Sequence, residues 1–268
     1  MSQEDLRKLK RKTIKLEEQL MEVRKILTET VIRLKRQENK FFELEEITSS
    51  YTYPPDRKIE SVQNQLIHLE KHFPSLHLGN VIPSALPEYA EGWIVVPKFS
   101  KIASDYNSAL EIALEIFAEA RPNFLNGREG ELGKEYLRLN NRTVRAIEML
   151  NETTKRDYLL LPVQLGSRHF GRSSRRARVL LKSNEFCLGP FEIAMFLLAH
   201  PKWLTREDDL GIDCAGGEYG PYKHARFKNI LCFYFLKNKL HFNDRWGGCP
   251  DEKFGVASAF LPKNLGLI

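Results

Sequence analysis

The N-terminal fifth of the chain repeats apolar residues in alternate steps of three and four. Nine of the twelve positions in this seam are apolar, and the alternation does not slip between residues 6 and 44. A heptad pattern sustained over this length is typical of a coiled coil. Because no Gly or Pro precedes Pro54, we expect one long coiled-coil helix over residues 1–50. The apolar seam residues are Leu6, Leu9, Leu16, Leu20, Val23, Leu27, Leu34, Phe41 and Leu44.

A coiled coil needs a second helix, and two sources are open. A second copy of the chain would use the nine seam residues as an oligomer interface, and this is the partner that we expect. Alternatively, a second predicted helix, residues 58–73, could return along the first as an antiparallel hairpin. Its apolar stripe is Ile59, Val62, Leu66 and Leu69.

The rest of the chain mixes helix and strand patterns without a regular repeat, which predicts the α+β class. We expect a coiled-coil helix at 1–50, a linker with the second helix at 51–92, and a globular α+β domain at 93–268. The elements predicted in that domain are strands at 93–96, 158–165 and 254–261, helices starting near 104 and around 144–150, a buried helix at 190–200, and a C-terminal antiparallel hairpin at 231–236 and 240–243.

Composition adds a mild positive charge of +6 on 268 residues. The segment 166–182 alone contains six basic residues and no acidic residue, which matches the whole net charge. Five of the six are arginine, the side chain best suited to bidentate contacts with phosphate or carboxylate groups. If the segment is helical, four of these arginines share one face and converge on one anion.

This segment predicts a protein that binds polyanions, and nucleic acid is the ligand that we favour. Neighbouring hydroxyl and imidazole groups would add neutral donors. An alternative interpretation pairs the arginines with acidic residues of the same fold. The protein would then be a non-enzymatic scaffold whose coiled coil is the functional surface. The predicted anion-binding residues are Arg168, His169, Arg172, Ser173, Ser174, Arg175, Arg176, Arg178 and Lys182.

Four separated motifs follow one another in the last 110 residues or so. They are LPVQLGSRHFGRSSRRARVLL, NEFCLGPFEIAMFLLAHPKWL, GIDCAGGEY and ASAFLP. This region resembles a family of uncharacterised proteins from small-genome candidate-phylum bacteria. The resemblance implies a bacterial cytosolic origin, and it assigns no activity and no functional residue.

An enzyme is a further alternative, centred on the glycine-rich stretch 211–220. Cys214 would be the nucleophile, with Asp213 beside it and His224 as a base. A lone Cys before Ala-Gly-Gly is more typical of a small buried residue at a turn, so we expect no catalytic residue. The cysteines and histidines lack the close pairs of a metal site, and no nucleotide-binding glycine loop is found. We therefore expect neither metal nor cofactor.

The chain starts with a charged stretch and shows no secretory signal pattern. Its most apolar run, residues 191–199, is about half a membrane span. We therefore expect no membrane association and a cytoplasmic protein with reduced cysteines.

Overall fold

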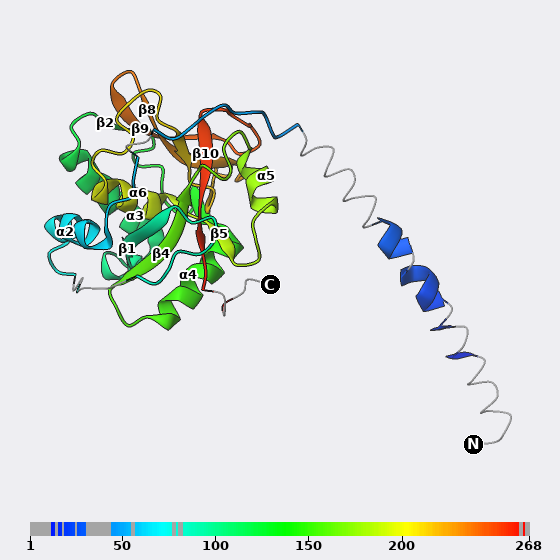
Figure 1. Ribbon diagram of the computed structural model, residues 1–268. Coiled ribbons are helices and arrows are strands. Elements are labelled where there is room, and N and C mark those ends of the chain that lie inside the picture. The colour runs from blue at the N-terminus through cyan, green and yellow to red at the C-terminus, as the bar shows by residue number, and fades with distance from the viewer. Residues whose placement is uncertain are drawn as a thin grey trace. The chain divides into compact units, whose positions relative to one another are not determined.

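The computed structural model describes residues 12–13, 16–17, 19–24, 26–30, 44–54, 57–76, 79, 83–262 and 265. The chain divides into two compact units, Met1–Leu44 and Glu45–Ile268. The second unit contains a mixed α+β fold, in which helices pack around one large sheet (Figure 1).

The prediction of a long coiled-coil helix over residues 1–50 is wrong. The described residues between 12 and 30 are helical, but the longest helix in the described part of the chain is α3, with fifteen residues. From residue 44 the chain forms a turn and then runs extended, because its backbone pairs with a distant loop instead of with itself. Of the predicted seam, Leu6, Leu9, Leu34 and Phe41 lie outside the described residues. Leu16, Leu20, Val23, Leu27 and Leu44 are each more than half exposed.

The sheet contains ten strands of the described chain, and most neighbours are antiparallel. Its main path runs β1-β4-β10-β6-β8-β7-β3, with β5 on β10, and β9 pairing β2 and β8. The strands are β1 (Gly92–Pro97), β2 (Phe124–Asn126), β3 (Leu137–Leu139), β4 (Tyr158–Leu165), β5 (Glu185–Cys187), β6 (Gly211–Asp213), β7 (Gly217–Tyr219), β8 (Asn229–Leu236), β9 (Lys239–Trp246) and β10 (Phe254–Phe260).

Strand β10 joins the two halves of this sheet. Its first three residues pair in parallel with β6, and residues 257–260 pair antiparallel with β4 and β5. A Cβ at Gly255 would overlap the backbone of Gly166, so the loop after β4 approaches β10 closely only because both residues are glycines. This contact fixes the position of the loop that carries the basic segment.

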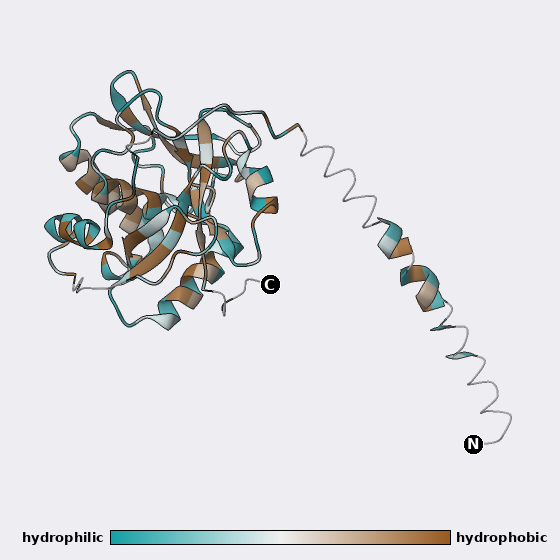
Figure 2. Ribbon diagram, viewed as in Figure 1, coloured by the Kyte–Doolittle hydropathy of each residue, from teal (hydrophilic) through white to brown (hydrophobic). Residues whose placement is uncertain are grey.

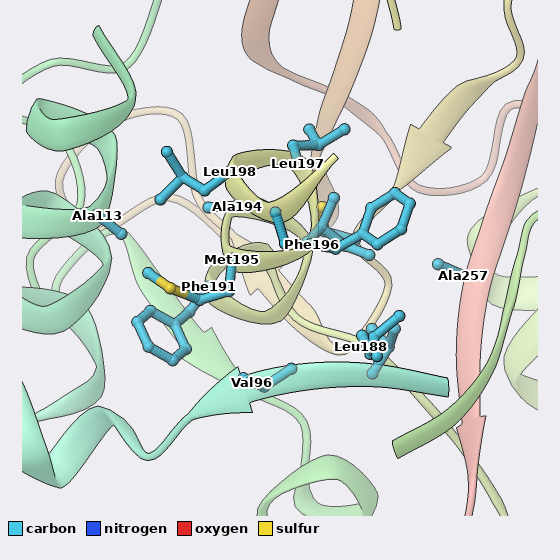
Figure 3. Packing of buried hydrophobic residues seen from close by; sticks show 14 of the residues in the cluster. Val96, Ala113, Leu188, Phe191, Ala194, Met195, Phe196, Leu197, Leu198 and Ala257 are labelled. Carbon is cyan, nitrogen blue, oxygen red and sulfur yellow. The ribbon is translucent and has the colours of Figure 1, made fainter. Parts of the chain in front are cut away.

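Helix α6 (Pro190–Ala199) is the centre of the core, and all ten of its residues are buried. In Figure 3 its side chains lie among residues of α3, β1 and β10, such as Ala113, Val96 and Ala257. The sequence PFEIAMFLLA is apolar on every side, which a helix surrounded by protein requires. In the described part of the chain no helix is long and apolar enough to cross a membrane.

The other helices pack partly on α6. Helix α3 (Tyr106–Ala120) and α2 (Val62–His72) contact it directly, and α2 also contacts β1. Helix α4 (Asn141–Thr153) has one hydrophobic side toward β5 and a hydrophilic side toward solvent (Figure 2). A short 3₁₀ turn, Phe99–Lys101, precedes α3.

Both ends of α6 receive buried polar partners. At its start, the Glu192 carboxylate accepts hydrogen bonds from the Tyr106 hydroxyl at 2.8 Å and the Gly189 N–H at 3.0 Å. At its end, the buried Arg121 guanidinium donates to three carbonyl oxygens. They belong to Leu197, His200 and Trp203, at 2.9, 2.8 and 2.9 Å. The bond to Leu197 satisfies a carbonyl that the end of α6 leaves without an internal donor, and the other two hold the turn after the helix.

Replacing Arg121 with Met should therefore destabilise the protein strongly. Burial lowers the pKa of Arg121 to about 10, so the side chain is still charged at neutral pH. Its loss leaves the buried Leu197 and Trp203 carbonyls unpaired and removes one of two donors from the His200 carbonyl, so we expect the free energy of unfolding to fall by about 3 kcal/mol in urea titrations. Arg138→Met is the matched control, because Arg138 is mostly exposed and should cost less than about 1 kcal/mol. Equal losses in the two variants would contradict this role for Arg121.

Candidate anion-binding site

The basic segment 166–182 is divided between a loop and a short helix. Residues 166–173 form the loop, and α5 (Ser174–Val179) follows it. Ser173 caps this helix, since its hydroxyl accepts a hydrogen bond from the Arg176 N–H at 3.0 Å. Arg168 and Arg172 lie in the loop, so the helical face that would have joined them to two further arginines does not form.

An extended piece of chain, residues 45–48, lies against this loop and is called the strap (the lighter blue trace that enters the globular unit in Figure 1). Glu46 forms an antiparallel β-bridge with Arg172. The strap therefore pairs with residues 171–173 as a short strand would. Two backbone hydrogen bonds flank the bridge, from the Ile47 N–H to the Gly171 carbonyl at 2.8 Å and from the Ser173 N–H to the Glu45 carbonyl at 2.9 Å.

The strap brings two adjacent carboxylates onto three arginines. Arg175 donates to the Glu45 carboxylate through Nη2 and, at 3.3 Å, through Nε. Arg172 and Arg176 both donate to Glu46, with Arg172 Nε at 3.4 Å. The hydroxyl of Ser173 also donates to Glu45. We refer to Arg172, Arg175 and Arg176 as the three-arginine cluster.

The cluster is only partly covered. The side chains of Arg172, Arg175 and Arg176 are 31, 39 and 20% exposed, whereas that of Glu45 is 5% exposed. The guanidinium of Arg175 also lies 5.0 Å from the ring centroid of Trp246, which is itself half exposed. Cationic and aromatic surfaces therefore meet at the edge of the site.

The charges at the cluster affect the acid that they hold. Burial raises the pKa of Glu46, but the hydrogen bonds and charges of Arg176 and Arg172 outweigh that effect and lower the pKa below its ordinary value. The Glu46 carboxylate is therefore ionised at neutral pH, and the guanidinium groups bind it as an anion.

The other basic residues of the segment bind their own chain. Arg178 donates to the carbonyl oxygens of Ala215 and Gly217 at 2.9 and 2.8 Å. Arg168 lies 3.3 Å from the Glu185 carboxylate. Its guanidinium also stacks over the Tyr89 ring, as does the ammonium group of Lys182, which lies 3.9 Å from Glu88. These three side chains stabilise the surrounding loops.

His169 and Ser174 are buried and point into the fold. His169 Nε2 lies 3.1 Å from the Glu185 carboxylate, which also accepts a bond from the Ser258 hydroxyl at 2.6 Å. Burial raises the pKa of Glu185, but the hydrogen bonds from His169 and Ser258 lower it overall. The Ser174 hydroxyl lies 3.3 Å from the buried Asp213 carboxylate. Of the nine predicted anion-binding residues, the structure brings the three arginines and Ser173 together around the strap.

The residues of the alternative enzyme site, Cys214, Asp213 and His224, do not form a nucleophile with its base. Cys214 is fully buried in the main core, and burial raises the pKa of its thiol well above the ordinary value. A buried neutral thiol is a poor nucleophile. Asp213 forms an ion pair with Arg245 at 3.0 Å, and His224 is exposed in a loop. In the described regions no group of three or more His, Cys, Asp or Glu residues is placed to hold a metal ion.

Reasoning from the sequence missed the acidic half of this site. Glu45 and Glu46 stand at the end of the heptad pattern, where adjacent acids usually lie on a solvated helix face. Gly171 was a possible signal, because it has φ +70° and a Cβ there would overlap the carbonyl oxygen of Ile47. Nothing local to residue 171 indicates which segment approaches it.

Known proteins give no indication of what this site does. No family model matches the chain, nor does any curated protein or any solved structure.

The buried Asp213 should make stability depend on pH. Burial raises its pKa to about 6, although Arg245 and Ser174 favour the charged form and lower it in part. The folded state therefore binds a proton more readily than the unfolded state, and the stability so gained is lost as the pH rises through 6. Between pH 5 and pH 7 we expect wild type to lose about 1 kcal/mol relative to Asp213→Asn, measured by urea unfolding. The same pH slope in both proteins would contradict the shift.

Proposed function

We propose that the protein binds polyanions without catalysing a reaction, and that the three-arginine cluster is its anion site. One observation carries this proposal: three guanidinium groups converge on two adjacent carboxylates at a partly exposed surface. Guanidinium groups bind phosphate in the same geometry as carboxylate, often through two parallel hydrogen bonds.

Single-stranded nucleic acid is the polyanion that we favour. The half-exposed Trp246 ring beside Arg175 offers a surface on which a base can stack, while the arginines contact the backbone. The site is smaller than the nine residues predicted from the sequence, because five of those side chains lie outside the cluster and contact other parts of the fold. We therefore expect modest, strongly salt-dependent affinity rather than sequence-specific recognition.

An acidic polypeptide is the second candidate ligand. The strap is itself an extended acidic segment, and it uses backbone hydrogen bonds that nucleic acid cannot reproduce. A partner of this kind would add a strand beside residues 171–173.

We also propose that the protein works in the cytoplasm and comes from a bacterium of the kind that its sequence motifs suggest. The cysteines at 187, 214, 232 and 249 are free thiols, and the first three are buried. Free thiols are the usual state in a reducing compartment.

Binding to a fluorescently labelled single-stranded oligonucleotide, followed across a salt series, tests the proposal. Three phosphate contacts predict that log K falls with log salt with a slope of about −2. The triple variant Arg172→Glu, Arg175→Glu and Arg176→Glu should lose binding, because three cations become anions. Arg172→Gln alone should weaken binding with little effect on folding, since Arg172 is partly exposed.

The control changes the same amount of charge at another surface. Lys223, Arg226 and Lys228 are exposed, and replacing all three with Glu should leave most of the affinity intact. Thermal unfolding of each variant separates loss of binding from loss of structure. Absence of binding by wild type at about 50 mM salt, or equal loss in the control, would refute the proposed function. Binding of poly-glutamate in place of the oligonucleotide would favour the second candidate.

A further inference from the structure

The strap occupies the surface that the proposed ligand needs. Its two carboxylates take the positions at which the arginines would hold two phosphates, and the Glu45 carboxylate is almost fully buried there. The structure therefore shows the three-arginine cluster with its anion-binding capacity filled by the protein's own chain.

The strap is fixed firmly on one side. Directly after it, the Ser49 hydroxyl donates to the Glu252 carbonyl at 2.9 Å, and the Tyr53 hydroxyl donates to the Leu165 carbonyl at 2.9 Å. The Tyr51 hydroxyl accepts a bond from the Leu210 N–H at 3.2 Å. Directly before it, the chain passes into the other compact unit, which ends at Leu44. Release of the strap therefore leaves the anchors at 49–53 in place.

Gly171 allows the strap to approach the loop closely. The carbonyl of Gly171 accepts the Ile47 N–H, and the missing side chain leaves room for the Ile47 carbonyl oxygen. Any other residue at 171 would meet both this overlap and a positive φ of 70°. This close approach involves the backbone of residue 171 and none of the arginine side chains.

We infer that the strap is a built-in competitor: the anionic ligand displaces Glu45 and Glu46 from the three-arginine cluster, and residues 45–48 detach from residues 171–173 as it binds. This inference rests on the proposed function, because it assumes that the cluster binds an external anion. Observed affinity is the intrinsic affinity multiplied by the fraction of open molecules, so a strap that is closed in nine molecules of ten weakens binding about tenfold.

Removing the charges of the strap tests this competition. The variant Glu45→Gln, Glu46→Gln keeps the shape of both side chains and should bind the labelled single-stranded oligonucleotide about tenfold more tightly than wild type. Two lost negative charges also raise affinity non-specifically. The matched control is therefore Glu115→Gln, Glu119→Gln on the exposed face of α3, which should gain less than about twofold.

Gly171→Ala opens the strap without changing any charge. Its methyl group overlaps the Ile47 carbonyl, so the variant should also bind more tightly than wild type. In wild type, hydrogen exchange gives a second readout. The Ile47 amide should exchange faster when the oligonucleotide is added, whereas the Leu210 amide, bonded to Tyr51, should stay protected.

The outcomes separate the inference from the proposed function. Tighter binding by both strap variants, with faster exchange at Ile47, supports the inference. Equal affinity of wild type and both strap variants, with binding still abolished by the arginine substitutions, overturns the inference and keeps the proposed function. No binding by any variant, or binding that ignores the arginine substitutions, overturns both.

Discussion

The complete burial of α6 is the constraint on which the rest of the fold depends. A helix with Phe, Ile, Met and Leu on every side must be surrounded, and α2, α3, β1 and the main sheet supply the surrounding surfaces. Its polar ends then need partners inside the protein, because no water reaches them. Glu192 and Arg121 meet that need from opposite ends. The layers around α6 and the two buried charges at its ends thus have one origin.

A second set of buried polar contacts connects the sheet to the loop of the anion site. Glu185 on β5 binds Ser258 on β10 and His169 in the loop after β4. Gln164 on β4 reaches the same Ser258 hydroxyl at 2.7 Å. These hydrogen bonds connect the loop to two strands of the sheet, although His169 Nδ1 has no hydrogen-bond partner in the described part of the chain. The loop from 166 to 173 is therefore attached to β5 and β10 next to the arginines of the cluster.

Continuous apolar runs in the sequence correctly predicted elements that are buried in the fold. The apolar run at 191–199 is the buried helix α6, and the aromatic run at 231–236 lies in β8, which forms a hairpin with β9. The long coiled-coil helix predicted from the heptad pattern is wrong, and at residues 45–48 the chain instead pairs with the loop at 171–173. Heptad spacing records which residues share a helix face, and it contains no information on such tertiary contacts.

The same limit applies to the site. The arginine-rich composition of 166–182 was visible in the sequence, but the partners of those arginines lie up to 130 residues earlier or 40 residues later. Only the fold distinguishes Arg178, which binds backbone carbonyls, from Arg175, which faces a carboxylate beside an exposed ring. Side-chain type therefore showed where the positive charge is concentrated, and only the three-dimensional placement shows which group each arginine contacts.

The direction in which the strap runs has a mechanical consequence. Because residues 45–47 pair antiparallel with 171–173, tension applied through residues 1–44 would reach the bond to the Glu45 carbonyl before the bond from the Ile47 amide. Tyr51 and Tyr53, which bond to the backbone of Leu210 and Leu165, follow both bonds in the sequence. Along the chain, any load passed from residues 1–44 to the globular unit therefore meets the contacts with the arginines before it meets these anchors.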